Sequence, residues 1–188
     1  WLNSDDSLLP GALFAISNYF SELNPKLLCG YMNVIQNNRI IGKNRIKAIK
    51  NPSESILSKL SQPSMFYSYS EILNIGIINE NLHHCMDLDL FIRFLIINDL
   101  SKIIYVEDVF SNFRIHERSK TFNDYYLFNR DKVKIASFIA YNLYQNYQKL
   151  PECISEMSKD YGDGDWQNMI IKRNNYLGKS IQVVLDLM

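Results

Sequence analysis

The sequence predicts a mixed α/β fold followed by a helical extension. Strand-like segments alternate with helix-like segments through residues 1–121, and only helical patterns follow from about residue 124. The chain has 188 residues, of which 47% are hydrophobic and 21% are charged, so it is long and apolar enough to form a buried core. We therefore expect an α/β domain over 1–121 and a helical extension over 122–188.

Strands are predicted where short apolar runs lie between turn residues. Trp1 and Leu2 run directly into polar residues, which is typical of a buried strand that delivers acids to the edge of a sheet. Asn37 and Asn38 tolerate the backbone of a tight turn and predict a hairpin. The other expected strands cover residues 26–35, 39–41, 65–69, 102–106 and 109–114.

Helices are predicted where apolar residues recur every three or four positions. The strongest pattern lies in residues 86–98, where Leu90, Phe94 and Ile97 form one stripe. Basic residues between 42 and 52 indicate an exposed loop. The expected buried face of a helix over 10–20 consists of Leu13, Ile16 and Phe20. The remaining expected helices cover 53–60, 70–73, 124–148, 152–159 and 165–187.

Charge and cysteine content argue against several classes of protein. The net charge is zero, so the composition gives no electrostatic support for a nucleic-acid partner. Cys29, Cys85 and Cys153 are odd in number and widely spaced, which argues against a disulfide framework or a zinc site and for a reducing compartment. No apolar run approaches the roughly 18 residues that a membrane span needs. We expect a cytoplasmic protein without a nucleic-acid partner.

The first candidate site is the acidic turn that ends the opening segment, WLNSDD. Asp5 and Asp6 are adjacent carboxylates, and hard divalent cations such as Mg²⁺ and Mn²⁺ prefer oxygen ligands. The alternative is that both acids are solvated turn residues before the helix that Pro10 opens.

The second candidate site is the acidic start of the 86–98 helix. Asp89 and Arg93 are four residues apart and can pair on one helix face. Asp87 points elsewhere in the first turn, so it is an unpaired carboxylate suited to act as a general base. The alternative is simple helix capping with a surface salt bridge.

The third candidate site is FRIHERSKT, residues 113–121. Arg114 and His116 point to the same side of a strand, and Lys120 follows in the loop. A guanidinium, an imidazole and an ammonium close together suit a diphosphate or a metal–phosphate complex. The alternative is a polar strand end with a solvated loop.

These clusters, in this order, resemble the family 2 glycosyltransferases with the GT-A fold. The resemblance covers about residues 1–121 and departs from the family where Asn3 replaces an acid and where Tyr31 and Met32 follow Gly30 without the usual acid. The matching segments are WLNSDD with LLPGAL, LLCGYM (27–32), SQPSMFYS (61–68), LNIGIINENLHHCMDLDLFIRF (73–94) and FRIHERSKT (113–121).

The resemblance implies a role for each candidate residue. Asp5 would be the principal ligand of a Mn²⁺ or Mg²⁺ ion, which His116 would approach. Asp87 would be the catalytic base, supported by Asp89 and Arg93. The residues that would bind donor or acceptor are Asn3, Asp6, Gln62, Arg114 and Lys120, of which Lys120 would neutralise the leaving nucleotide.

The resemblance also implies the reaction and the partners. A sugar would pass from a nucleotide-sugar donor to a hydroxyl of a glycan, a lipid-linked sugar or a protein, with inversion at the anomeric carbon. In the family, the segment before the metal motif forms the first strands and binds the nucleotide. We therefore expect these 188 residues to form a partial GT-A fold that binds nucleotide weakly alone and self-associates.

Several alternatives stay open at this point. The 122–188 extension can pack on the acceptor side, contact the inner face of a membrane, pair with another subunit or simply cap the domain. A non-catalytic interaction module that keeps the fold is one rival function. A metal-dependent hydrolase that uses the same acids to activate water is another.

Overall fold

The structure, a computed structural model, has a mixed α/β architecture, as the sequence predicts. Its residues fall into two compact units, which are described separately. The sheet unit contains Trp1–Ala48, Ser58–Asn74 and Ser101–Asp124, and the α3 unit contains Ile49–Leu57, Ile75–Leu100 and Tyr125–Met188. The described residues are 1–48, 60–80, 82–98, 100–117, 119–120, 124, 127–128, 131–132 and 135.

The sheet unit is built on a five-stranded mixed sheet in which β2 and β5 run parallel along most of their length. On its other side β2 pairs antiparallel with β4 and then with β3, while β1 pairs antiparallel with β5. Asn37 and Asn38 have φ values of 50° and 59°, which confirms the predicted tight turn. The strands are β1 Ser7–Leu8, β2 Leu27–Gln36, β3 Arg39–Asn44, β4 Met65–Tyr67 and β5 Ile103–Ile115.

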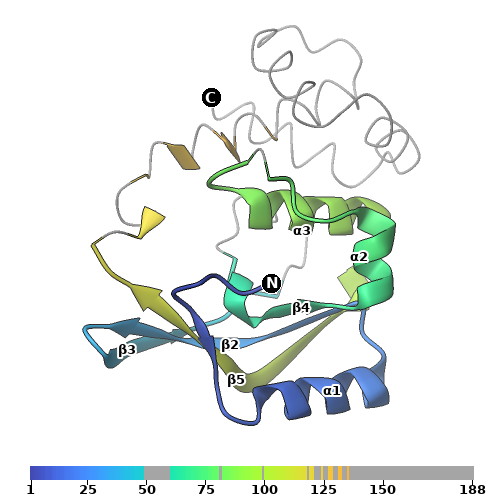
Figure 1. The fold of residues 1–188 in the computed structure, drawn as a ribbon. Coiled ribbons are helices and arrows are strands. Elements are labelled where there is room, and N and C mark those ends of the chain that lie inside the picture. Colours follow the sequence, from blue (N-terminus) through green and yellow to red (C-terminus); the bar gives the residue numbers. More distant parts are fainter. Residues whose placement is uncertain are drawn as a thin grey trace, which may run out of the picture. The chain divides into compact units, whose positions relative to one another are not determined.

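Helix α1 covers one face of this sheet (Figure 1). Ala12 and Ile16 of this helix are buried, whereas Leu13 is 67% exposed. The predicted buried face is therefore wrong at Leu13. The small side chains of Ala12 and Ala15 let the helix approach the strands. The helices are α1 Ala12–Leu23, α2 Tyr69–Ile75 and α3 Met86–Ile97, with short 3₁₀ turns η2 Gln62–Ser64 and η3 Leu100–Lys102.

Two predicted strands differ from those observed. Trp1 and Leu2 are exposed and lie outside any strand, because a tight turn follows them in which the Asp6 N–H donates to the Asn3 carbonyl at 3.2 Å. The segments 102–106 and 109–114 form one strand, β5. The β2–β5 register shifts beside the intervening acidic residues, so bulges accommodate them without ending the strand.

Several other predicted segments are only partly described or lie outside the described residues. Strand β3 continues through Asn44, into the expected 42–52 loop. The expected 53–60 helix lies almost wholly outside the described residues, as do the helices over 152–159 and 165–187. Within the expected 124–148 helix, residues 127–128, 131–132 and 135 are helical.

The close packing of β2 on β5 depends on Gly30. A Cβ atom at this position would lie 2.3 Å from the Phe110 ring and 2.9 Å from the Asp108 carbonyl oxygen. Gly30→Ala is therefore expected to lower the free energy of unfolding by about 1–3 kcal/mol. Gly42→Ala is the matched control, because no heavy atom lies within 4 Å of a Cβ there. Equal melting temperatures for the two variants would contradict this packing.

Helix α3 is the core of its unit. Leu90 and Phe94 are buried, as predicted, and neighbouring apolar residues on other sides of the helix are buried as well. Helices that are apolar all round are typical of protein interiors or membranes. Among the residues that the structure describes, no helix has the length and apolar character needed to cross a bilayer.

Candidate functional site

The acidic N-terminal turn lies against the end of β5. His116 Nε2 is 3.1 Å from Asp5 Oδ2, although 111 residues separate them in the sequence. Pairing of β1 with β5 brings the two segments together. Both side chains are more than one-third exposed, so this pair is open to a ligand. The structure thus joins the two residues that the resemblance assigns to the metal.

Asp6 anchors the same turn to the sheet. Its Oδ1 accepts a hydrogen bond from the Arg114 backbone N–H at 3.1 Å. Partial burial raises the pKa of Asp6; the Asp5 charge adds to this rise, while hydrogen bonds from Arg114 and Asn3 oppose it. These contacts are internal to the protein and support a positioning role for Asp6.

Asn3 links the N-terminal turn to Gln62, the first residue of η2. Asn3 Nδ2 donates to Gln62 Oε1 at 3.2 Å and lies 3.4 Å from Asp6 Oδ2. Gln62 Nε2 donates to the Trp1 carbonyl at 2.9 Å. Asn3, at the position where the family has an acid, therefore connects Asp6 to Gln62. The structure brings together three of the predicted residues in one hydrogen-bonded chain.

Two buried serines lie next to Gln62 in the fold: Ser64, in the Gln-Pro-Ser segment, and Ser111, which the sequence did not single out. Ser64 Oγ donates to the Tyr31 carbonyl at 2.7 Å and lies 2.6 Å from Ser111 Oγ. These bonds hold η2 on the sheet. In the sequence, only the Gln-Pro-Ser segment indicates these contacts, because Ser111 lies 47 residues further along the chain.

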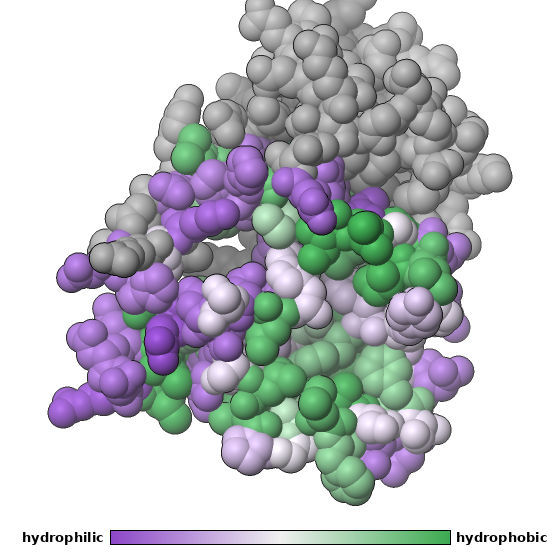
Figure 2. Space-filling model, in the orientation of Figure 1, coloured by the Kyte–Doolittle hydropathy of each residue, from purple (hydrophilic) through white to green (hydrophobic). Residues whose placement is uncertain are grey.

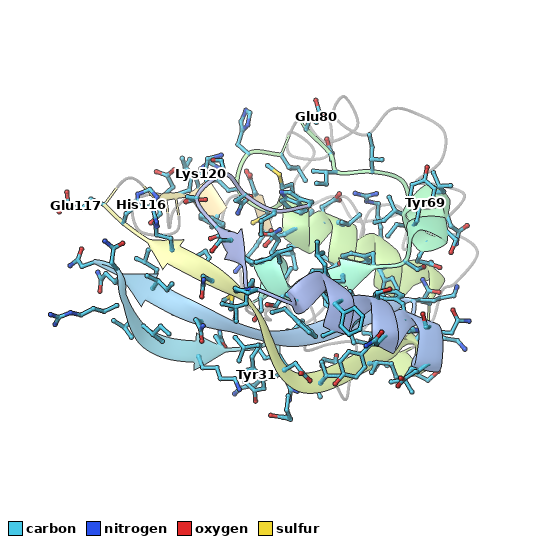
Figure 3. All side chains as sticks on the ribbon, turned by 60° about the horizontal axis from the view of Figure 1, so that its bottom comes forward. Tyr31, Tyr69, Glu80, His116, Glu117 and Lys120 are labelled. Carbon is cyan, nitrogen blue, oxygen red and sulfur yellow. The ribbon has the colours of Figure 1, made fainter. Side chains whose placement is uncertain are left out.

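Lys120 and His116 lie at the same end of the sheet unit, just beyond β5 (Figure 3). The turn between them is closed by Ser119, whose N–H and Oγ–H both donate to the His116 carbonyl, at 2.9 and 2.6 Å. Ser119 is a positioning residue that sequence reasoning missed, although serine is common in such turns. The Arg114 side chain is exposed on the adjacent strand end.

This turn offers two side chains that can ligate a divalent cation. Asp5 offers a carboxylate and His116 an imidazole, a combination that suits Mn²⁺ at least as well as Mg²⁺. Within the described part of the chain, no group of three or more His, Cys, Asp or Glu side chains could hold a metal ion. Such an ion would therefore take its other ligands from water and from a bound diphosphate.

The start of α3 carries the second candidate site. Asp87 is half-buried, and its Oδ1 accepts a hydrogen bond from the Leu88 N–H at 2.8 Å. Burial raises the pKa of Asp87 to about 6; the backbone hydrogen bonds and Lys132 oppose this rise, and Asp89 adds to it. A carboxylate with such a pKa is ionised at neutral pH but accepts a proton more readily than an ordinary aspartate.

Asp89 and Arg93, which follow Asp87 on α3, form a buried ion pair. Their side chains are almost fully buried, and Arg93 Nε and Nη2 donate to Asp89 Oδ2 at 3.0 and 2.9 Å. The predicted pairing is confirmed, but it lies in the interior and not on the surface. The guanidinium also donates to the carbonyls of Ile75, Gly76 and Ile77, at 2.7, 3.0 and 2.8 Å.

The described cysteines are unsuited to nucleophilic chemistry. Burial raises the pKa of the Cys85 thiol to about 12 and that of Cys29 further still. Both thiols stay protonated near neutral pH and pack as small apolar groups. The reactive groups of the described residues are therefore carboxylates, imidazoles and cations.

A scan against protein-family models and a search of curated proteins both found no match to this chain.

Proposed function

We propose that this chain carries the metal turn and the general base of an inverting, metal-dependent glycosyltransferase with a GT-A type fold. The observation that carries the proposal is the contact between Asp5 and His116. It brings together two motifs from opposite ends of the expected domain, a carboxylate and an imidazole that can both ligate a metal ion.

Asp5 and His116 would hold a Mn²⁺ or Mg²⁺ ion, which when bound supplies positive charge to the diphosphate of a nucleotide-sugar donor. Lys120, at the same end of the sheet unit, would add a further cation for the leaving nucleotide. Asn3 and Asp6 fix the shape of the turn, so Asp5 is presented in one orientation.

Asp87 would take the proton of the acceptor hydroxyl. The acceptor oxygen then forms its bond to the anomeric carbon while the bond from that carbon to the diphosphate breaks. The proton resides on Asp87, and the nucleoside diphosphate leaves with the electron pair. A single base is sufficient for such a direct displacement. The raised pKa of Asp87 supports this role, because its carboxylate is ionised at neutral pH and still a useful base.

Manganese binding tests the metal half of this proposal. Paramagnetic Mn²⁺ added with a nucleoside diphosphate is expected to broaden the NMR signals of the His116 ring at substoichiometric concentration. Asp5→Asn should weaken Mn²⁺ binding at least about tenfold, because a charged ligand is lost. Glu22→Gln is the matched control, since Glu22 is an exposed acid on α1. Broadening that Asp5→Asn leaves unchanged would contradict the assignment.

A further inference from the structure

The β2–β3 hairpin is a local concentration of positive charge in a chain whose net charge is zero. Residues 36–48 contain no acid. They contain four cations, Arg39, Lys43, Arg45 and Lys47. The composition of the whole chain therefore hides a basic segment, part of which contacts Glu107 of β5.

Two large aliphatic side chains are exposed in the same segment. Ile40 is 64% exposed and Ile41 is 56% exposed, on the edge strand β3. The register passes from Ile35↔Ile40 to Val34↔Gly42, which leaves Ile41 as a bulge residue. A bulge interrupts the alternation of side chains between the two faces of a sheet, so Ile40 and Ile41 can lie on the same surface.

Two of these four cations contact other groups of the protein. Arg39 and Lys47 are exposed, while Lys43 lies with its Nζ 4.0 Å from the centre of the Tyr31 ring. Arg45 pairs with Glu107 at 3.0 Å. Figure 2 shows a hydrophobic area bordered by hydrophilic surface over this hairpin, at the lower left.

We propose that the β2–β3 hairpin binds a membrane surface rich in anionic lipids. Ile40 and Ile41 enter the boundary between headgroups and acyl chains, while Arg39 and Lys47 contact the anionic headgroups. The combination favours lipid over nucleic acid, because the exposed apolar residues are aliphatic and the nearby Tyr31 ring is covered by Lys43. The turn of the hairpin lies at one end of the sheet, beside the end of β5 (Figure 1).

Co-sedimentation with vesicles tests this proposal. The full chain is mixed with vesicles of phosphatidylcholine alone or of phosphatidylcholine and phosphatidylglycerol at a ratio of about 7:3. We expect binding to the anionic vesicles that weakens as salt is raised, and little binding to the neutral ones. Ile40→Ser with Ile41→Ser should weaken binding at least about tenfold. Arg39→Gln with Lys47→Gln should weaken it about fivefold per cation removed.

Helix α1 supplies the matched control. Leu13 and Phe14 are also adjacent and exposed, at 67% and 73%, but residues 7–23 contain no Lys or Arg. Leu13→Ser with Phe14→Ser should leave vesicle binding unchanged. Loss of binding in this variant but not in the isoleucine variant would overturn the proposal, as would equal binding to neutral vesicles. Tight binding of a single-stranded oligonucleotide that is insensitive to the isoleucine variant would identify a general polyanion surface and would also overturn it.

Discussion

Replacing Asp87 by asparagine is expected to lower the turnover of sugar transfer by about a thousandfold, while donor binding changes little. The amide keeps the size of the carboxylate but cannot accept the proton of the acceptor hydroxyl. A positioned general base contributes about 100- to 10,000-fold to such a step. The measurement is kcat with saturating donor and acceptor, with the donor dissociation constant measured separately.

The pH dependence of the same reaction separates a base from a structural acid. Because the pKa of Asp87 is raised to about 6, kcat/KM should be high above that pH and should fall as the pH drops through it. The Asp87→Asn variant should lose this acidic limb. Asp108→Asn, a change at an exposed acid on β5, is the control that should keep both turnover and the limb. Unchanged turnover in Asp87→Asn would contradict the assignment of the base.

Replacing Arg93 by methionine is expected to lower the free energy of unfolding by about 3–5 kcal/mol. The change removes the guanidinium that pairs with the buried Asp89 carboxylate and the hydrogen bonds to three carbonyls, those of residues 75–77. Chemical denaturation measures the loss. Arg39→Met, at an exposed arginine, should change stability by less than about 0.5 kcal/mol.

A double variant shows whether the buried charge is the cause. Asp89→Asn combined with Arg93→Met removes both charges, so it should be more stable than Arg93→Met alone. If Arg93→Met costs no more than Arg39→Met, the guanidinium does not hold the 75–77 segment.

The sequence predicts contacts well where both partners lie on one element. Asp89 and Arg93 are four residues apart on a helix, and helical geometry alone pairs them. The three carbonyls that also accept hydrogen bonds from Arg93 belong to a segment 16 to 18 residues away. Their contacts depend on how that segment folds back, which no local pattern records.

Strand errors have a related cause. Trp1 and Leu2 are apolar, but a strand also needs a neighbouring strand, and the chain turns before it reaches one. Glu107 and Asp108 look like a break between two strands, yet a parallel neighbour with a bulged register carries β5 past them. In both cases tertiary pairing, not local hydropathy, decides the outcome.

The sequence predicts the candidate metal turn only in part. The resemblance to family 2 glycosyltransferases assigns Asp5 and His116 to one metal site, and the structure places their side chains in contact. The serine bonds that shape this site, at Ser64 and Ser119, join backbone groups whose positions only the folded chain defines.

The proposed metal-dependent sugar transfer is tested most directly by proton NMR. The chain is mixed with Mn²⁺, an acceptor and a panel of UDP- and GDP-sugars. We expect a metal-dependent glycosidic bond whose anomeric configuration is opposite to that of the donor, and loss of this product in Asp5→Asn and Asp87→Asn. Free sugar as the only product, or a product that forms equally well without Mn²⁺, would contradict the proposal.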